Sequence, residues 1–540
     1  MPRAVNSGKN IVIMTRKDIF VRGLFLSFLL VGIWLRWENI DKKVYWHDEV
    51  FTSLRTAGFT GEEVVNELFT GEILSRSDLL RYQTLSSHTD FGQTIAALKT
   101  HPEHPPLYYI LVRFWQDWFG SSIATMRSLS VIFSLLVFPA LYWFCYVLFQ
   151  SDAVALMAVL LMTVSPFHVI YAQEARQYSL WTLTLLLTYG SFWQAVHQKH
   201  KFHWLTFGVT TILSLYTKLF TVLALLATTV YLFWREKRFY TKVIRNYFLV
   251  LLGSTIAFSP WVILIITKFE QLREKTAWTE AVVSSSFLVK LWGLHFSSLL
   301  IDLGLSLDHP YTYLVPPLIL VLISYGLLIL RKHKKRDIFL FLLCLLLIPS
   351  LSLILPDVIL GGRRSTMTRY FIPSLISGQV IIAYLFTSQI HQKVWQGLVG
   401  FILILGLISS WKISQAEVWW NKTVSQQNIN TATIINQVSK PLIISTNKGE
   451  TNLGDIFSLA HYVELETKFQ LFQSTNETHQ IKKTSSTFLY KPSVELTNIM
   501  TQQHPVQIIQ YQKLPLSQVV WKSHDSQDRD HTEESGLGTP

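Results

Sequence analysis

The sequence predicts an all-α polytopic membrane protein that ends in a small soluble α/β domain. Three observations lead to this fold class. The 540 residues are 50% hydrophobic and 14% aromatic. The apolar residues are concentrated in runs of roughly 17–25 residues, which is the length that crosses a bilayer. After residue 411 these runs stop, and short strand-like segments follow in polar, turn-rich sequence.

The first apolar run, Ile19 to Trp37, follows a basic N-terminal stretch. It is longer than the apolar part of a signal peptide, about 7–15 residues, and no small-residue cleavage site follows it. We interpret it as a retained first span, with a cleaved signal peptide as the alternative. Residues 38–122 then form a large first extracytoplasmic loop. This loop contains a short aromatic helix over residues 105–120, which we place along the membrane interface.

Further spans bring the predicted total to about eleven. They are expected near residues 123–149, 153–170, 175–196, 204–217, 219–234, 247–267, 313–330, 338–355, 370–388 and 394–411. Another apolar helix, near 287–305, is expected to be interfacial or re-entrant. In this topology the densest basic clusters, within 235–245 and 331–336, fall in cytoplasmic loops, as the positive-inside rule requires.

The formal net charge of +12 does not indicate nucleic-acid binding, because the basic residues cluster in short loops between spans. The two cysteines, Cys145 and Cys344, lie inside apolar runs, which excludes a disulfide framework and favours buried core positions. The predicted parts are a transmembrane domain over 1–411, a small extracytoplasmic domain over 412–522 and a disordered tail over 523–540. Within the second part, strands are expected at 442–445, 487–490 and 506–509.

Ionisable and polar residues from five segments are expected at the extracytoplasmic ends of the spans. Ionisable residues cost roughly 2.5–3.5 kcal/mol each at mid-bilayer, so their convergence indicates a functional cavity. The alternative is that each residue merely caps a span at the headgroup level. The residues are His47, Asp48 and Glu49; His101, Glu103 and His104; Glu174, Arg176 and Tyr178; Lys218; and Arg363, Arg364, Arg369 and Tyr370.

One dominant carboxylate beside several cations suits the transfer of a group away from a phosphate. A leaving phosphate needs fixed positive charge, which Arg and Lys provide. A single carboxylate then suffices to orient or deprotonate the incoming hydroxyl. Adjacent side chains such as Asp48 and Glu49 diverge, so we expect separate roles for them. The spacing of His101, Glu103 and His104 also permits a divalent metal, with ordinary loop residues as the alternative.

Four motifs in order resemble the GT-C membrane glycosyltransferases, most closely the bacterial enzymes related to protein mannosyltransferases and aminoarabinose lipid A transferases. The motifs are Asp48-Glu49, His104-Pro105-Pro106-Leu107-Tyr108-Tyr109, Glu174-Ala175-Arg176-Gln177-Tyr178-Ser179-Leu180 and Tyr216-Thr217-Lys218. Arg369-Tyr370 with Pro373 is similar to a late motif of the same group. The resemblance covers residues 15–411 and leaves the C-terminal part out.

The resemblance implies inverting transfer of a sugar from a polyprenyl-phosphate donor to a lipid, glycan or protein acceptor, on the extracytoplasmic face of the plasma membrane. The implied catalytic carboxylate is Asp48, on the acceptor side. Its neighbour Glu49 is a second catalytic candidate, with a structural, metal-binding or orienting role left open. The implied ligands of the donor phosphate are Arg176, Lys218, Arg369 and Tyr370. The residues that would position donor or acceptor are His104, Glu174 and Tyr178. The aminoarabinose transferases have lysine where His104 stands, so the acceptor stays open.

Two other functions also stay open: a transporter or flippase, and an oligosaccharide polymerase or ligase of the cell envelope. Transporters favour spans broken by Gly or Pro, with polar groups near mid-membrane. Here the charges gather at one face beside a long loop, which favours the transferase. The expected partners are the donor lipid, the acceptor and membrane lipids.

Overall fold

The computed structural model describes residues 16–86, 89–238, 240–422, 424–475, 481–484 and 486–521. It divides into two compact units. The first unit comprises the described residues within 1–40, 130–263 and 269–415. The second unit comprises the described residues within 41–129, 264–268 and 416–540. Each unit is therefore built from segments that lie far apart in the sequence.

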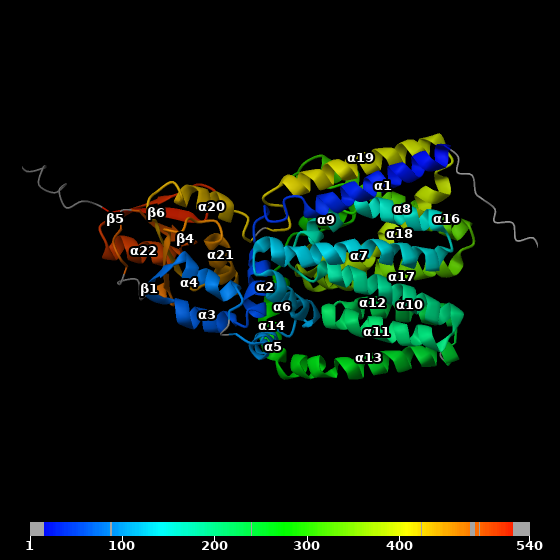
Figure 1. The fold of residues 1–540 in the computed structure, drawn as a ribbon, viewed down its shortest axis with the longest axis horizontal. Helices are drawn as coiled ribbons and strands as arrows, with labels where there is room; N and C mark the ends of the chain where they lie inside the picture. The colour runs from blue at the N-terminus through cyan, green and yellow to red at the C-terminus, as the bar shows by residue number, and fades with distance from the viewer. Residues whose placement is uncertain are drawn as a thin grey trace, which may run out of the picture. The chain divides into compact units, whose positions relative to one another are not determined.

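The first unit is a bundle of helices. They are α1 (Arg16–Trp37), α7 (Ile123–Phe149, from residue 130 on), α8 (Asp152–Thr163), α9 (Pro166–Ala172), α10 (Tyr178–Gln198), α11 (Lys201–Thr217), α12 (Thr221–Glu236), α13 (Lys242–Thr267, up to residue 263), α14 (Phe269–Thr276), η2 (Ala277–Glu280), α15 (Ser285–Ser297), α16 (Tyr311–Lys332), α17 (Arg336–Leu360), η3 (Arg364–Thr366), η4 (Thr368–Phe371), α18 (Ile372–Gln389) and α19 (Lys393–Gln415). Figure 1 shows its long helices running alongside one another, and α10 with α11, α12 with α17 and α17 with α18 are packed pairs.

A helix lies at every position where a span is predicted, but the count of eleven is not confirmed. Among the described residues, six helical segments are long and apolar enough to cross a membrane: α7, α13, α16, α17, the η4–α18 segment and α19. The bent pair α8 and α9 would make seven if it is one span. Helices α11 and α12 have 17 and 16 residues, whereas a span needs about 20.

The span predicted over 153–170 is interrupted, which corrects the expectation of one continuous helix. Helix α8 ends at Thr163 and α9 begins at Pro166, with a bend of 62° between them. Proline has no N–H to donate, and its ring collides with the preceding turn of a helix. Pro166 therefore starts a new helix instead of continuing the old one.

Helix α13 presents an apolar surface typical of contact with lipid. Leu249, Leu252, Ile256, Ile263 and Ile266 are each more than half exposed. Only 17% of its most apolar stretch is buried inside the protein. A contiguous apolar surface of this kind is rare on soluble monomers. Together with the other apolar helices, it identifies a multi-pass membrane protein.

The second unit combines short helices with a sheet. From the first loop it takes α2 (His47–Thr56), α3 (Gly61–Leu68), β1 (Thr70–Ser75), α4 (Arg76–Leu80), η1 (Arg81–Gln83), α5 (Phe91–Lys99) and α6 (Leu107–Phe119). From the C-terminal part it takes α20 (Asn428–Ile435), β2 (Leu442–Thr446), α21 (Glu450–Ala460), β3 (Lys468–Phe472), β4 (Thr487–Tyr490), α22 (Val494–Gln503), β5 (Val506–Gln510) and β6 (Leu516–Trp521).

The six strands form one mixed sheet in the order β1-β3-β2-β4-β6-β5. Strands β3, β2 and β4 are parallel, with Leu442 opposite Lys468 on one side and Thr487 on the other. Strand β1 is antiparallel to β3, and β6 is antiparallel to both β4 and β5. The predicted strands are present as β2, β4 and β5, whereas β1, β3 and β6 were not predicted. The predicted tail over 523–540 lies outside the described residues.

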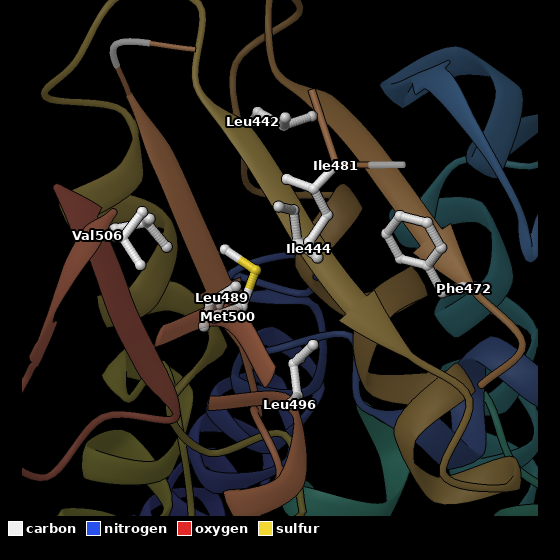
Figure 2. Close-up of a cluster of buried hydrophobic side chains, with 9 residues drawn as sticks. Leu442, Ile444, Phe472, Ile481, Leu489, Leu496, Met500 and Val506 are labelled. Atoms are coloured by element: carbon white, nitrogen blue, oxygen red, sulfur yellow. The ribbon is translucent and has the colours of Figure 1, made fainter. Parts of the chain in front are cut away.

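One face of this sheet packs against helix α22, and Figure 2 shows the side chains that do so. The cluster contains Leu442, Ile444, Phe472, Ile481, Leu489, Leu496, Met500, Val506 and Val519. Because side chains alternate along a strand, Ile443 and Phe488 point to the opposite face, and both are buried too. The parallel strands are therefore covered on both faces, as parallel strands usually are.

Candidate active site

The Tyr45–Glu49 segment begins helix α2 in the second unit. Trp46 is the N-cap residue, so His47, Asp48 and Glu49 form the first helical turn. The helix dipole stabilises carboxylates in that position. Consecutive residues on a helix point about 100° apart, and the two carboxylates accordingly meet different surroundings.

Glu49 is the buried carboxylate of the pair. It is 0% exposed, and its two oxygens accept hydrogen bonds from Arg127 Nε at 2.8 Å and Nη2 at 2.7 Å. Lys422 Nζ lies 3.6 Å from the Glu49 carboxylate. Arg127 also donates to the main-chain carbonyls of Lys43 and Val44, at 2.9 Å and 3.0 Å. These contacts indicate that Glu49 fixes the structure around the start of α2.

Asp48 is the more accessible carboxylate. Its side chain is 18% exposed, and Oδ1 lies 3.2 Å from His47 Nε2. The backbone N–H of His47 donates to Ser425 Oγ at 3.0 Å, and the Ser425 hydroxyl donates to Asp455 at 2.6 Å. Residues from the C-terminal part thus hold the backbone at the start of α2 and leave the Asp48 side chain partly open.

Two further C-terminal contacts fix the same segment. The backbone N–H of Tyr45 donates to the Tyr462 hydroxyl at 2.6 Å. Gly454 of α21 packs so closely that a Cβ there would lie 2.7 Å from the His47 Cβ. Only glycine permits that approach. Sequence reasoning missed this role of the C-terminal part, because no local pattern reports contacts between such distant residues.

His101, Glu103 and His104 lie together in the second unit. His101 Nδ1 lies 3.1 Å and His104 Nε2 lies 3.8 Å from the same Glu103 oxygen. Burial raises the pKa of Glu103, but the His101 hydrogen bond and the charges of His101 and Arg55 outweigh it and lower the pKa to about 2. Among the described residues, no three or more His, Cys, Asp or Glu side chains are arranged to hold a metal ion. In this arrangement one Glu103 oxygen contacts both imidazoles, and His101 Nε2 also lies 3.6 Å from the Glu450 carboxylate.

In the first unit, Lys218, Arg369, Tyr370 and Tyr178 lie together, and we call them the cation–tyrosine cluster. Lys218 Nζ is 5.6 Å from the centre of the Tyr370 ring. Arg369 Cζ is 5.7 Å from the ring centres of both Tyr178 and Tyr370. The Tyr370 ring in turn stacks on Phe220, with 4.4 Å between ring centres. The structure thus brings together four of the residues predicted to form the site.

The turn between α9 and α10 supplies two further predicted residues of this unit, Glu174 and Arg176. Glu174 and Arg176 are both buried, and the backbone N–H of Arg176 donates to the Glu174 carbonyl at 2.7 Å. Ser130 Oγ donates to the Arg176 carbonyl at 3.3 Å. Tyr178 is the first residue of α10. The turn therefore leads directly from Arg176 into the cation–tyrosine cluster.

The segment that carries Arg369 is shaped by two buried residues that sequence reasoning missed. Asp357 accepts hydrogen bonds from the backbone N–H of Ser365 at 2.6 Å and from its hydroxyl at 2.7 Å. His295 contacts Thr368 Oγ1 at 2.8 Å and the Ser365 carbonyl at 3.1 Å. The sequence offered one signal for this role. Asp357 is an acidic residue inside an apolar run, and such a residue needs a partner.

Cations held against aromatic rings are suited to binding an anion. A ring face attracts a cation without cancelling its charge. Arg can offer a phosphate two parallel hydrogen bonds, and Lys adds a point charge. The cation–tyrosine cluster can therefore bind a phosphate group.

Comparisons with known proteins show which chains this one is similar to. Residues 103–264 match the family model described as dolichyl-phosphate-mannose-protein mannosyltransferase. The structure is similar to ArnT from Cupriavidus metallidurans in the apo state, with a TM-score of 0.54 and 10% identity over 93% of this chain and 98% of that one. The same protein bound to undecaprenyl phosphate gives a TM-score of 0.52 and 10% identity over 94% and 98%. No curated protein matches the sequence.

Proposed function

Because the chain has the GT-C glycosyltransferase fold that its motifs predict, we propose that it is an inverting glycosyltransferase. It moves a sugar from a polyprenyl-phosphate donor to a lipid, glycan or protein acceptor. The reaction takes place on the extracytoplasmic face of the plasma membrane. The name of the matched family model and the undecaprenyl phosphate bound to ArnT support this donor class.

The cation–tyrosine cluster is the observation that carries this proposal. During transfer the bond between the sugar C1 and the phosphate oxygen breaks, and negative charge develops on the phosphate. Lys218 and Arg369 stabilise that charge, with Arg176 as a third cation. Hydroxyl groups of Tyr178 and Tyr370 can donate hydrogen bonds to the same phosphate. Glu174 helps to place Arg176, because the two residues share one turn.

Asp48 acts on the acceptor. It takes the proton of the acceptor hydroxyl while the hydroxyl oxygen bonds to C1, and this single displacement inverts the configuration at C1. His104 helps to position the acceptor. Glu49 was expected as a second catalytic carboxylate, but Arg127 occupies both of its oxygens. We therefore assign Glu49 to positioning the turn that carries Asp48.

A transfer assay on the full-length protein in lipid nanodiscs tests the proposal. The substrates are polyprenyl-phosphate sugars, and the readout is released polyprenyl phosphate. Wild-type protein is expected to release it, and Asp48→Asn is expected to lose about 10²–10⁴-fold in rate, the range for general base catalysis. Asp41→Asn, an exposed carboxylate of the same loop, is the matched control. A flippase would move the lipid between leaflets without breaking the C1–O bond, and an unchanged rate in folded Asp48→Asn would remove Asp48 from the mechanism.

A further inference from the structure

The sheet of the second unit contains a cavity that the proposed transfer does not use. Its volume is about 440 Å³, and Lys448, Asn452 and Lys491 are among the residues that line it. Ligand sites in proteins commonly measure roughly 300–1,000 Å³. No residue of this cavity has a part in the proposed transfer.

The cavity lies where ligands bind in parallel sheets. Strand β2 stands between β3 and β4, so the chain leaves β2 for one neighbour and later returns to the other. Lys448 follows the carboxyl end of β2, and Lys491 directly follows that of β4. In open sheets with parallel strands, ligands bind outside the carboxyl ends at such a reversal of strand order.

The two lysines lie close together at this cavity. Lys448 Nζ donates a hydrogen bond to the main-chain carbonyl of Lys491. Burial, and then the charge of Lys491, lower the pKa of Lys448. Lys491 forms an ion pair with Asp455. An anionic group beside both lysines would relieve the repulsion between them.

Asn452 adds a hydrogen-bond acceptor to the cavity wall. It is 4% exposed, and its Nδ2 donates to the Thr446 carbonyl at 2.8 Å. Its Oδ1 is buried and has no hydrogen-bond partner among the residues that the structure describes. Buried polar atoms usually have a partner, and an amide oxygen accepts from a hydroxyl or an N–H.

We propose that this cavity binds an anionic ligand that also carries hydroxyl groups, with the chemistry of a uronic acid or a sugar phosphate. The carboxylate or phosphate lies against Lys448 and Lys491, and a sugar hydroxyl donates to Asn452 Oδ1. The site is separate from the proposed transfer, because it needs neither Asp48 nor the cation–tyrosine cluster.

Isothermal titration of the full-length protein in detergent tests the site. The probes are glucuronate, glucose 1-phosphate, neutral glucose and inorganic phosphate. We expect one or both of the anionic sugars to bind and neutral glucose to bind much more weakly. Which anionic sugar binds more tightly distinguishes a carboxylate from a phosphate ligand. No donor lipid is present, so the outcome does not depend on whether the protein transfers sugar.

Variants then locate the binding. Lys448→Gln should weaken binding about tenfold, the effect of losing one charged hydrogen bond. Lys482→Gln removes an exposed lysine outside the cavity and should bind as the wild type does. A Lys491 variant is a poorer probe, because it would also lose the ion pair with Asp455. The proposal is wrong if neither anionic sugar binds, if Lys448→Gln binds unchanged, or if inorganic phosphate binds as tightly as the anionic sugar that binds best.

Discussion

Glu49 in the second unit and Lys218 in the first are both buried charged residues, but their surroundings differ. Glu49 is paired through both oxygens with Arg127, and Lys422 lies beside it. Lys218 lies near the rings of Tyr370 and Phe220. An ion pair joins two opposite charges, whereas a ring face stabilises a cation without itself supplying a negative charge. The first arrangement suits a fixed structure, and the second suits a binding site.

The largest effect expected from this difference is the loss of stability when Glu49 is replaced. Glu49→Gln leaves Arg127 buried with a neutral partner, and breaking a buried ion pair costs about 3–5 kcal/mol. We expect a much lower unfolding temperature or loss of folded protein, measured by thermal unfolding in detergent. Glu464→Gln, an exposed glutamate of the same unit, should unfold as the wild type does. A Glu49→Gln protein of wild-type stability would show that Glu49 is not a structural residue.

A smaller effect tests the aromatic rings. Tyr370→Leu removes the ring between Lys218 and Arg369, and each contact between a cation and a ring is worth about 0.5–1 kcal/mol or more. We expect polyprenyl phosphate to bind roughly five- to thirtyfold more weakly. Tyr370→Phe keeps the ring and loses only the hydroxyl, so it should bind polyprenyl phosphate more tightly than Tyr370→Leu does. If Leu and Phe behave alike, the ring does not hold the two cations in place.

A third effect concerns how the Tyr45 region responds to pH. His461 packs edge-on against Tyr45, with ring centres 5.1 Å apart. Burial first, and then the charges of Arg76 and Arg127, lower its pKa to about 3, from 6.5 in the unfolded chain. Its contribution to stability is thus complete above about pH 6.5 and is lost as the pH falls toward 3, by about 1.4 kcal/mol per unit.

Chemical unfolding in detergent between pH 7 and pH 5 measures this loss. His461→Gln should show a shallower decline in stability than the wild type. Equal slopes would mean that His461 is also protonated in the folded protein.

The helical part of the fold could be predicted from local patterns, because a span is a single apolar run. The sheet could only partly be predicted. Strand β1 comes from the first loop and pairs with β3 near the other end of the chain, with Ile73 opposite Gln470. No local pattern reports such a pairing. The interruption at Pro166 could have been read from the proline itself, but the apolar run on both sides of it favoured one long helix.

The candidate site, like the fold, could be predicted only in part from local patterns. Charged residues at the ends of apolar runs are conspicuous, and Lys218 and Arg369 were predicted as functional residues for that reason. Their gathering with Tyr178 and Tyr370 is now observed within one unit. Glu49 is held by Arg127 and Lys422. These two partners could not be predicted, because they come from distant parts of the chain. The metal site also could not be judged from spacing, which does not show where an imidazole points.

The central claim is that the cation–tyrosine cluster binds the donor phosphate and Asp48 carries out the chemistry. Binding of polyprenyl phosphate and release of polyprenyl phosphate from the donor, measured side by side on Asp48→Asn and Lys218→Met, test it most directly. We predict that Asp48→Asn binds the lipid as the wild type does but turns over about 10²–10⁴-fold more slowly. Lys218→Met should bind at least about tenfold more weakly. A wild-type rate of release by Asp48→Asn, or wild-type binding by Lys218→Met, would contradict this account.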